Sequence, residues 1–94
     1  MLKKLDPLLH NELRLAIMSL LINVDSAEFN YLLENTGSTR GNLSVQIQKL
    51  KDAGYLTVTK SFRDNYPLTT CKIEPNGREA FEGYVKAIST YFKG

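Results

Sequence analysis

Residues 38–54 read Ser-Thr-Arg-Gly-Asn-Leu-Ser-Val-Gln-Ile-Gln-Lys-Leu-Lys-Asp-Ala-Gly, and the predicted architecture is built around this segment. Leu43, Ile47 and Leu50 recur at helical spacing, which predicts a helix that buries one face. Gly54 is expected to end this helix in a left-handed conformation. The side opposite the buried face is predicted to point outward and carries Gly41, Val45, Gln48 and Asp52.

A shorter helix is predicted immediately before it. Ser26 is expected to cap a helix over residues 27–35, and Gly37 to end that helix. Ser38 or Thr39 then supplies the N-cap of the longer helix. A short helix, a turn and a longer helix with a polar outward side are typical of a helix-turn-helix, which we place at residues 26–53.

The chain begins with another predicted helix, over residues 7–22. Asp6 is a suitable N-cap, and Pro7 fits the first helical position. One apolar ridge is formed by Leu9, Leu13, Ala16, Ile17, Leu20 and Leu21, and a second by Leu8, Leu15, Met18 and Ile22. Because a helix that is apolar on two sides must bury both, the second ridge is expected to meet another helix or a second subunit.

The third quarter of the chain has the pattern of a β-hairpin. Over residues 56–62, Leu56, Val58, Lys60 and Phe62 alternate with Thr57, Thr59 and Ser61, the pattern of a half-buried strand. Residues 63–67 are rich in turn formers, and 69–73 predicts a returning strand. Glu74 and Pro75 then begin a last helix that extends to about residue 92. Its apolar stripe consists of Phe81, Tyr84, Val85, Ile88, Tyr91 and Phe92.

The order of these elements predicts an α+β, mostly α, winged helix-turn-helix. It consists of a three-helix core, a two-stranded β wing over residues 55–73 and a C-terminal dimerisation helix over 75–92. A chain of 94 residues with 43% hydrophobic residues has room for one core, so residues 1–94 are expected to form a single domain.

Composition excludes several kinds of chemistry. One cysteine and one histidine allow neither an intrachain disulfide nor a thiolate zinc cluster nor a paired-imidazole metal site. The sequence also lacks a glycine-rich phosphate loop and a nucleophile elbow. We therefore expect neither an enzyme nor a bound cofactor or metal. No signal peptide or membrane-length apolar run is visible, so the expected location is the cytoplasm.

The small net charge of +2 is unevenly distributed. Residues 38–72 contain six basic and two acidic side chains, whereas the remaining residues contain six basic and eight acidic ones. A basic middle segment fits a surface that faces a polyanion, and a chance imbalance on a solvated surface explains the charge equally well.

Several motifs, in order along the whole chain, resemble a small MarR-like winged-helix family. These are Leu5-Asp6-Pro7-Leu8-Leu9-His10-Asn11, Leu13-Arg14-Leu15-Ala16-Ile17, Gly41-Asn42-Leu43-Ser44, Leu50, Ala53-Gly54-Tyr55, Lys60-Ser61-Phe62, Pro67-Leu68-Thr69-Thr70 and Gly77-Arg78. The resemblance implies a stand-alone transcriptional regulator that binds double-stranded DNA as a homodimer. The chain departs from the family pattern at Gln46, Lys51, Cys71 and Glu74, so a relative's operator sequence cannot be transferred to it.

The DNA-binding residues are predicted by placing the longer helix of the helix-turn-helix in the major groove of DNA and the wing beside it. Short or polar groups on the outward arc would contact bases, and these are Gly41, Ser44, Val45 and Gln48. Residues near the helix start and cationic residues would contact the backbone, and these are Thr39, Arg40, Asn42, Lys49, Lys51, Lys60, Arg63 and Lys72. Arg63, at the hairpin tip, would enter the minor groove or lie along the backbone, with Lys60 and Lys72 beneath it. Simpler roles stay open: Thr39 as a cap, Gly41 as a tolerated residue, and Lys49 and Lys51 as solubilising groups.

The end helices carry the predicted homodimer interface. Its residues are Leu8, Leu15, Met18, Ile22, Tyr84, Ile88, Tyr91 and Phe92. The alternative is that the last helix folds back on the first within one chain. Tyr66 is expected to pack at the wing base, with contact to sugar and phosphate as the alternative. His10 is expected to make a local hydrogen bond, and Cys71 to lie in the core rather than to act as a redox sensor. The alternative function is a protein–protein interaction module that does not bind DNA; no effector molecule can be named.

Overall fold

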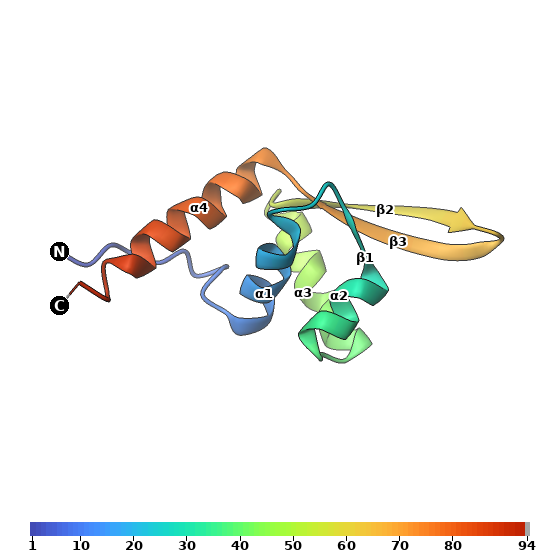
Figure 1. Cartoon of the computed structure of the whole chain (residues 1–94), viewed down its shortest axis with the longest axis horizontal. Helices are drawn as coiled ribbons and strands as arrows, with labels where there is room; N and C mark the ends of the chain where they lie inside the picture. The colour runs from blue at the N-terminus through green and yellow to red at the C-terminus, as the bar shows by residue number, and fades with distance from the viewer. Residues whose placement is uncertain (94) are drawn as a thin grey trace.

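The computed structural model describes residues 1–93, which form four helices and three strands (Figure 1). In chain order these are α1 (Glu12–Leu21), β1 (Ala27–Glu28), α2 (Phe29–Thr36), α3 (Arg40–Asp52), β2 (Leu56–Arg63), β3 (Tyr66–Ile73) and α4 (Pro75–Ser89). The helices α1, α2 and α3 pack together, while the hairpin of β2 and β3 projects from one side of them and α4 from the other (Figure 1). The predicted winged helix-turn-helix is confirmed.

The core lies between the three packed helices and the base of the hairpin. Its fully buried side chains come from every element except β1 and α4, whose Ala27, Tyr84 and Ala87 are nearly buried. These fully buried residues are Leu9, Ile17, Met18, Leu21, Leu32, Leu43, Leu50, Leu56 and Cys71. The inward face predicted for α3 is correct, since Leu43, Ile47 and Leu50 are all buried.

The predicted local signals around α3 are also correct. The Thr39 hydroxyl accepts a hydrogen bond from the backbone N–H of Asn42 at 3.1 Å, which identifies Thr39 as the N-cap. Gly37 and Gly54 have φ values of +66° and +78°, so both adopt the left-handed conformation expected after a helix.

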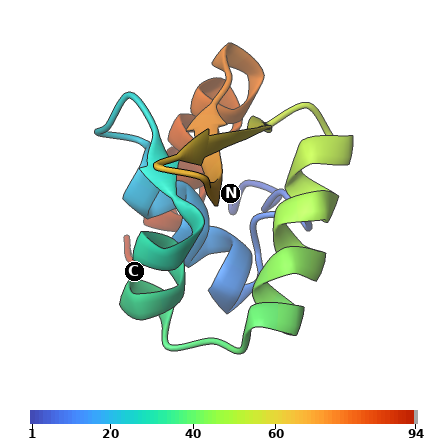
Figure 2. The same ribbon diagram turned by 90° about the vertical axis from the view of Figure 1, so that its right-hand side faces the viewer.

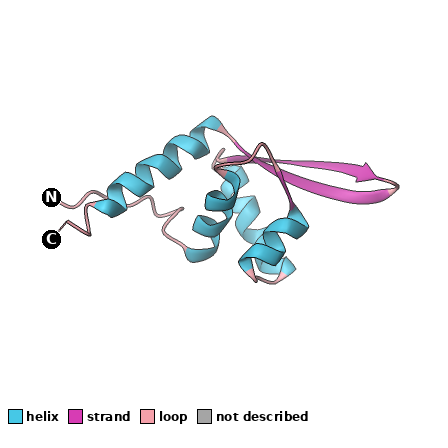
Figure 3. Ribbon diagram, viewed as in Figure 1, coloured by secondary structure: helices cyan, strands magenta, loops and turns pink. Residues whose placement is uncertain are grey.

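The wing sheet has three strands rather than the predicted two. Its order is β1-β3-β2 and all pairs are antiparallel. Figure 3 shows the strands in magenta and the helices in cyan. Residues 27 and 28 were predicted to be helical, but Ala27 pairs with Cys71 and Glu28 with Thr70, so α2 begins only at Phe29. Ser26 is therefore not its N-cap. That position belongs to Glu28, which makes no side-chain capping bond.

The hairpin turn is tighter than the sequence suggested. Asp64 and Asn65 have φ values of +49° and +68°, the geometry of a two-residue hairpin loop with both central residues left-handed. As a result β3 begins at Tyr66, not at Thr69, and Phe62 pairs with Pro67. The two long strands form an arm that extends well beyond the helices (Figure 1).

The first helix is shorter than predicted. The Asp6 side chain accepts a hydrogen bond from the Leu8 N–H at 2.9 Å and so caps a single turn that ends at His10. Asn11 has an extended backbone, and its side chain accepts the N–H of Arg14, which starts α1 anew at Glu12. Two competing caps thus divide a segment that apolar periodicity alone assigns to one helix.

The last helix begins as predicted at Pro75 but ends at Ser89, short of residue 92. Both chain ends lie near the far end of α4 (Figure 1), where the Tyr91 hydroxyl donates a hydrogen bond to the Lys3 carbonyl at 3.1 Å. Within the described part of the chain, no helix is both long and apolar enough to cross a membrane.

Candidate nucleic-acid interface

The outward side of α3 is open to solvent. Leu43, Ile47 and Leu50 hold the opposite side in the core, so the residues between them must point away from it. The four residues predicted to contact bases, Gly41, Ser44, Val45 and Gln48, are all exposed. Viewed along the hairpin, α3 and α2 stand on either side below its base (Figure 2).

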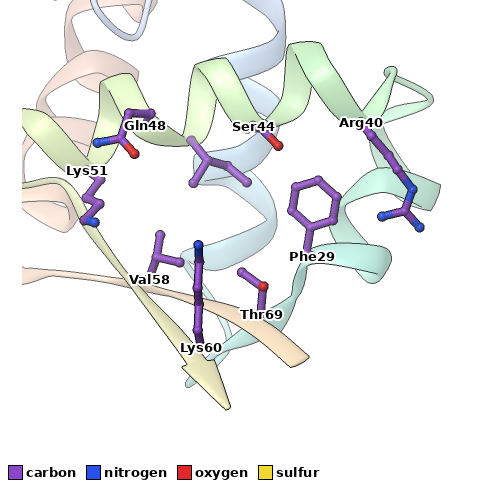
Figure 4. Close-up of a pocket in the computed structure, with 9 residues that line it drawn as sticks. Phe29, Arg40, Ser44, Gln48, Lys51, Val58, Lys60 and Thr69 are labelled. Carbon is purple, nitrogen blue, oxygen red and sulfur yellow. The ribbon is translucent and has the colours of Figure 1, made fainter. Parts of the chain in front are cut away.

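A hollow of about 400 Å³ separates α3 from the wing, and we call it the wing groove (Figure 4). One wall is α3 and the other is the face of β2 and β3 that is turned toward it. The groove is lined by Phe29, Arg40, Ser44, Ile47, Gln48, Lys51, Val58, Lys60 and Thr69. Three cations and two hydrogen-bonding side chains of the predicted site thus meet around one concave surface.

Arg40 is held in place at the end of the groove nearest the start of α3. Its guanidinium carbon lies 5.7 Å from the centre of the Phe29 ring, within the range of a cation–π contact. A guanidinium N–H also donates to the Asn30 side-chain oxygen at 3.1 Å. These two contacts orient the cation, yet they leave most of its five N–H donors free for a ligand.

Gln48 is oriented in a similar way. Its side-chain nitrogen donates to an Asp52 carboxylate oxygen at 2.7 Å, one helical turn further along α3. An amide nitrogen has two hydrogens, so Gln48 keeps one N–H donor and its carbonyl acceptor. These are the groups that a bidentate contact with adenine requires.

The cations of the wing do not share one face. Successive strand residues point to opposite sides, so Lys60 faces α3, whereas Arg63 and Lys72 lie on the other face of the ribbon. Arg63 is bound there by Glu28, with nitrogen–oxygen distances of 3.3 Å to both carboxylate oxygens. Of the two lysines predicted beneath Arg63, Lys72 therefore shares its face nearer the wing base, whereas the placement of Lys60 there is wrong.

The remaining predicted backbone contacts lie outside the wing groove. Asn42 accepts a hydrogen bond from the Gln46 side chain at 3.0 Å and faces a separate hollow near Asn11. Thr39 is exposed and is occupied as the N-cap. Lys49 is exposed on α3 but does not line the groove.

Sequence reasoning missed the groove residues Phe29, Val58 and Thr69 as parts of a site. Phe29 lies half-buried beneath Arg40. No local signal identifies it, because its position depends on β1 joining the sheet. Tyr66 was expected to pack at the wing base, but it is 75% exposed near the hairpin tip.

The end helices carry a second candidate surface. An apolar hollow of about 450 Å³ lies between α1 and α4, and it is lined by Glu12, Leu15, Ala16, Ser19, Phe81, Tyr84, Val85 and Ile88. Ile22, Phe81, Val85 and two charged residues line a neighbouring hollow. We call these two hollows together the end-helix groove.

Two residues predicted for the dimer interface belong to the core instead. Met18 is fully buried within one chain and approaches Gly77 of α4. Tyr84 is 6% exposed and its hydroxyl lies 3.0 Å from His10 Nδ1, so the hydrogen bond of His10 is long-range rather than local. The other predicted interface residues, Leu8, Leu15, Ile22, Ile88, Tyr91 and Phe92, are half-buried or exposed.

Comparison with known proteins agrees with this geometry. Residues 13–92 match the family model of the winged helix DNA-binding domain. An uncharacterized protein of Methanocaldococcus jannaschii is 37% identical over 75 residues, which cover 80% of this chain and 82% of that protein. A transcriptional regulator homologue from Pyrococcus horikoshii has a similar structure, with a TM-score of 0.85, 28% identity and coverage of 93% of this chain and 86% of that one.

More distant structures share the fold. A MarR family transcriptional regulator from Silicibacter pomeroyi has a TM-score of 0.65 and 11% identity, over 87% of this chain and 57% of that one. At that identity the likeness concerns the fold alone. The family match over most of the chain is decisive: this chain belongs to the family of winged-helix DNA-binding domains, and its fold is that of MarR-type transcriptional regulators.

Proposed function

We propose that this protein is a homodimeric, sequence-specific regulator of transcription, with α3 in the major groove of duplex DNA. The observation that carries the proposal is the meeting of Arg40, Lys51 and Lys60 around the wing groove. A major groove about 12 Å wide admits one helix. The DNA strand that borders it would then lie in the wing groove, where its phosphates meet the three cations.

Base recognition would come from the exposed side of α3. Ser44 and Gln48 offer hydrogen bonds, Val45 offers an apolar contact for a thymine methyl, and Gly41 lets the backbone approach closely. Thr39 and Asn42 lie where a helix N-terminus would meet phosphate. Lys49 is placed to reach the backbone beyond the wing groove, while Arg63 and Lys72 contribute only to the general positive field.

Dimerisation would use the end-helix groove. The hollow between α1 and α4 is almost entirely apolar, and its residue Val85 is exposed, as are Tyr91 and Phe92 beyond α4. A second copy of α4 seated there would bury this surface on both subunits of a two-fold dimer. The two α3 helices would then address half-sites about 34 Å apart.

The test begins with duplexes selected from a random pool by the purified protein. Their affinity is measured by fluorescence anisotropy at several salt concentrations, and each phosphate contact should add about 0.9 to the log–log slope. Lys60→Gln should lower that slope by about one, whereas Lys72→Gln, on the opposite face of the wing, is the matched control and should change it less.

The outcomes separate the parts of the proposal. If the wild type binds no duplex even at low salt, DNA binding is rejected and a protein–protein module becomes the better reading, with Val45 and Tyr66 as exposed apolar anchors. If the wild type binds but Lys60→Gln and Lys72→Gln change the salt slope equally, DNA binding stands. The proposal that phosphates lie in the wing groove is then rejected.

A further inference from the structure

The tip of the wing carries an exposed apolar pair. Phe62 is 76% exposed and pairs across the hairpin with Pro67, which is also exposed. Because paired residues of a hairpin share one face, the two side chains lie together, and we call them the wing-tip pair. An exposed phenylalanine at the end of an extended arm contributes nothing to the core of its own chain.

The wing-tip pair lies on the face of the wing that is turned toward α3. Leu56, Val58, Lys60 and Phe62 alternate with residues of the other face; the first is buried, and the next two line the wing groove. Phe62 follows Lys60 by two residues, which places it about 7 Å further out along the strand. The apolar tip therefore continues the wall of the cationic groove.

The cation of the tip is turned away from this face. Arg63 lies on the other side of the ribbon, where both of its terminal nitrogens contact the Glu28 carboxylate. Glu28 is fixed at the sheet edge by the pairing of β1 with β3. At the end of the arm, the group presented toward a ligand in the wing groove is consequently the Phe62 ring and not a guanidinium.

The charged residues of the wing groove indicate which kind of partner binds the wing-tip pair. Arg40, Lys51 and Lys60 border the same groove, so the partner must combine a polyanionic edge with an apolar recess beyond it. Duplex DNA has this combination, because the minor groove lies across one phosphate strand from the major groove and exposes stacked base edges. Phe and Pro are among the residues that enter a minor groove as wedges between base pairs.

We propose that Phe62, backed by Pro67, inserts into the minor groove, partly unstacks one base step and bends the DNA. This inference rests on the proposed function, since it assumes that α3 occupies the adjacent major groove. Pyrimidine–purine steps unstack most readily, so the bound sites should favour TA or CA/TG where the wing tip lands. Wedge residues of this kind bend a duplex by tens of degrees toward the major groove.

The experiment uses the full chain and one duplex that the wild-type protein has selected from a random pool. Dyes at the two ends report bending by energy transfer, and 2-aminopurine placed in turn at each flanking step reports unstacking. The test variants are Phe62→Ala and Phe62→Leu. Tyr66→Ala is the matched control, because Tyr66 is equally exposed near the tip but points to the opposite face.

We expect Phe62→Ala to abolish both the bend and the 2-aminopurine signal and to weaken binding about tenfold. Phe62→Leu should keep most of the bend, and Tyr66→Ala should change none of the three readouts. Because Phe62 is exposed, all variants should keep the wild-type circular dichroism spectrum and melting temperature.

Four results would overturn the wedge. A wild-type complex with straight, fully stacked DNA, or equal effects of Phe62→Ala and Tyr66→Ala, would reject it while leaving DNA binding intact. A change of oligomeric state in Phe62→Ala would assign the exposed ring to a second copy of the chain. If the wild type selects no duplex at all, the proposed function fails first, and the wedge fails with it.

Discussion

Gly77, in the first turn of α4, lies directly against the backbone carbonyl of Tyr55. A Cβ atom added at Gly77 would stand 2.0 Å from that oxygen and 2.8 Å from its carbon, which no side-chain movement can relieve. The same carbonyl accepts a hydrogen bond from the backbone N–H of Glu74 at 2.9 Å. The start of α4 therefore packs against Tyr55, which lies between α3 and β2. The contact fixes where the last helix leaves the domain.

Gly77→Ala should therefore be strongly destabilising. Separating α4 from Tyr55 also strains the Glu74 hydrogen bond, and we expect the free energy of unfolding to fall by at least about 2 kcal/mol. Gly83→Ala is the matched control, because it lies in the same helix with nothing within 4 Å of an added Cβ. It should instead raise stability by about 0.5–1 kcal/mol. Urea unfolding measures both, and equal effects would disprove the tight contact.

The Tyr55 hydroxyl donates a 2.6 Å hydrogen bond to the Asp6 carboxylate and so ties the first turn of the chain to the wing base. Burial, followed by this hydrogen bond and the charge of Asp6, raises the pKa of Tyr55 to about 12. An acid whose pKa is raised on folding stabilises the fold below its unfolded pKa, near 10, and that contribution is lost as the pH rises toward 12.

Wild-type stability should accordingly fall between pH 10 and 12 by more than that of Tyr55→Phe, which has no proton to lose there. At neutral pH, Tyr55→Phe should cost on the order of 1 kcal/mol through the lost hydrogen bond. Urea midpoints across this pH range give the comparison. Parallel pH profiles for the two proteins would show that the Tyr55 proton is not linked to folding.

Cys71 should be chemically inert in the folded protein. It is fully buried at the base of the sheet, and burial raises the pKa of its thiol to about 11. Only the thiolate reacts with alkylating reagents, so iodoacetamide at neutral pH should label the native chain very slowly and the urea-unfolded chain quickly. Mass spectrometry follows the labelling. Rapid modification without urea would revive the redox-sensor reading that core burial argues against.

The parts of the fold that the sequence predicted well are those whose signals are local. Gly37 and Thr39 precede α3 and Gly54 follows it, so these residues predict where the helix begins and ends. The helical spacing of Leu43, Ile47 and Leu50 predicts which of its faces is buried. The errors occur where a distant partner decides the structure. Ala27 and Glu28 have no strand pattern of their own, and they are extended because the free edge of β3 pairs with them.

The site shows the same division. Strand alternation alone could have separated Lys60 from Arg63, so that error was avoidable. The ion pair of Arg63 with Glu28 and the ring of Phe29 beneath Arg40 could not be foreseen, since both depend on β1 joining the sheet. Individual residues were thus identified from type and spacing, but their grouping around the wing groove required the tertiary structure.

The proposed dimer can be tested at Val85. This residue lines both hollows of the end-helix groove, yet it is 48% exposed in the single chain. A lysine there would place a charge inside an interface without disturbing the core, so Val85→Lys should be a folded monomer with weakened binding to palindromic duplexes. Gly83→Lys adds the same charge to the same helix outside the groove and should remain dimeric. Sedimentation equilibrium separates the cases: a dimeric Val85→Lys protein, or a monomeric wild type, would show that this groove is not where two copies meet.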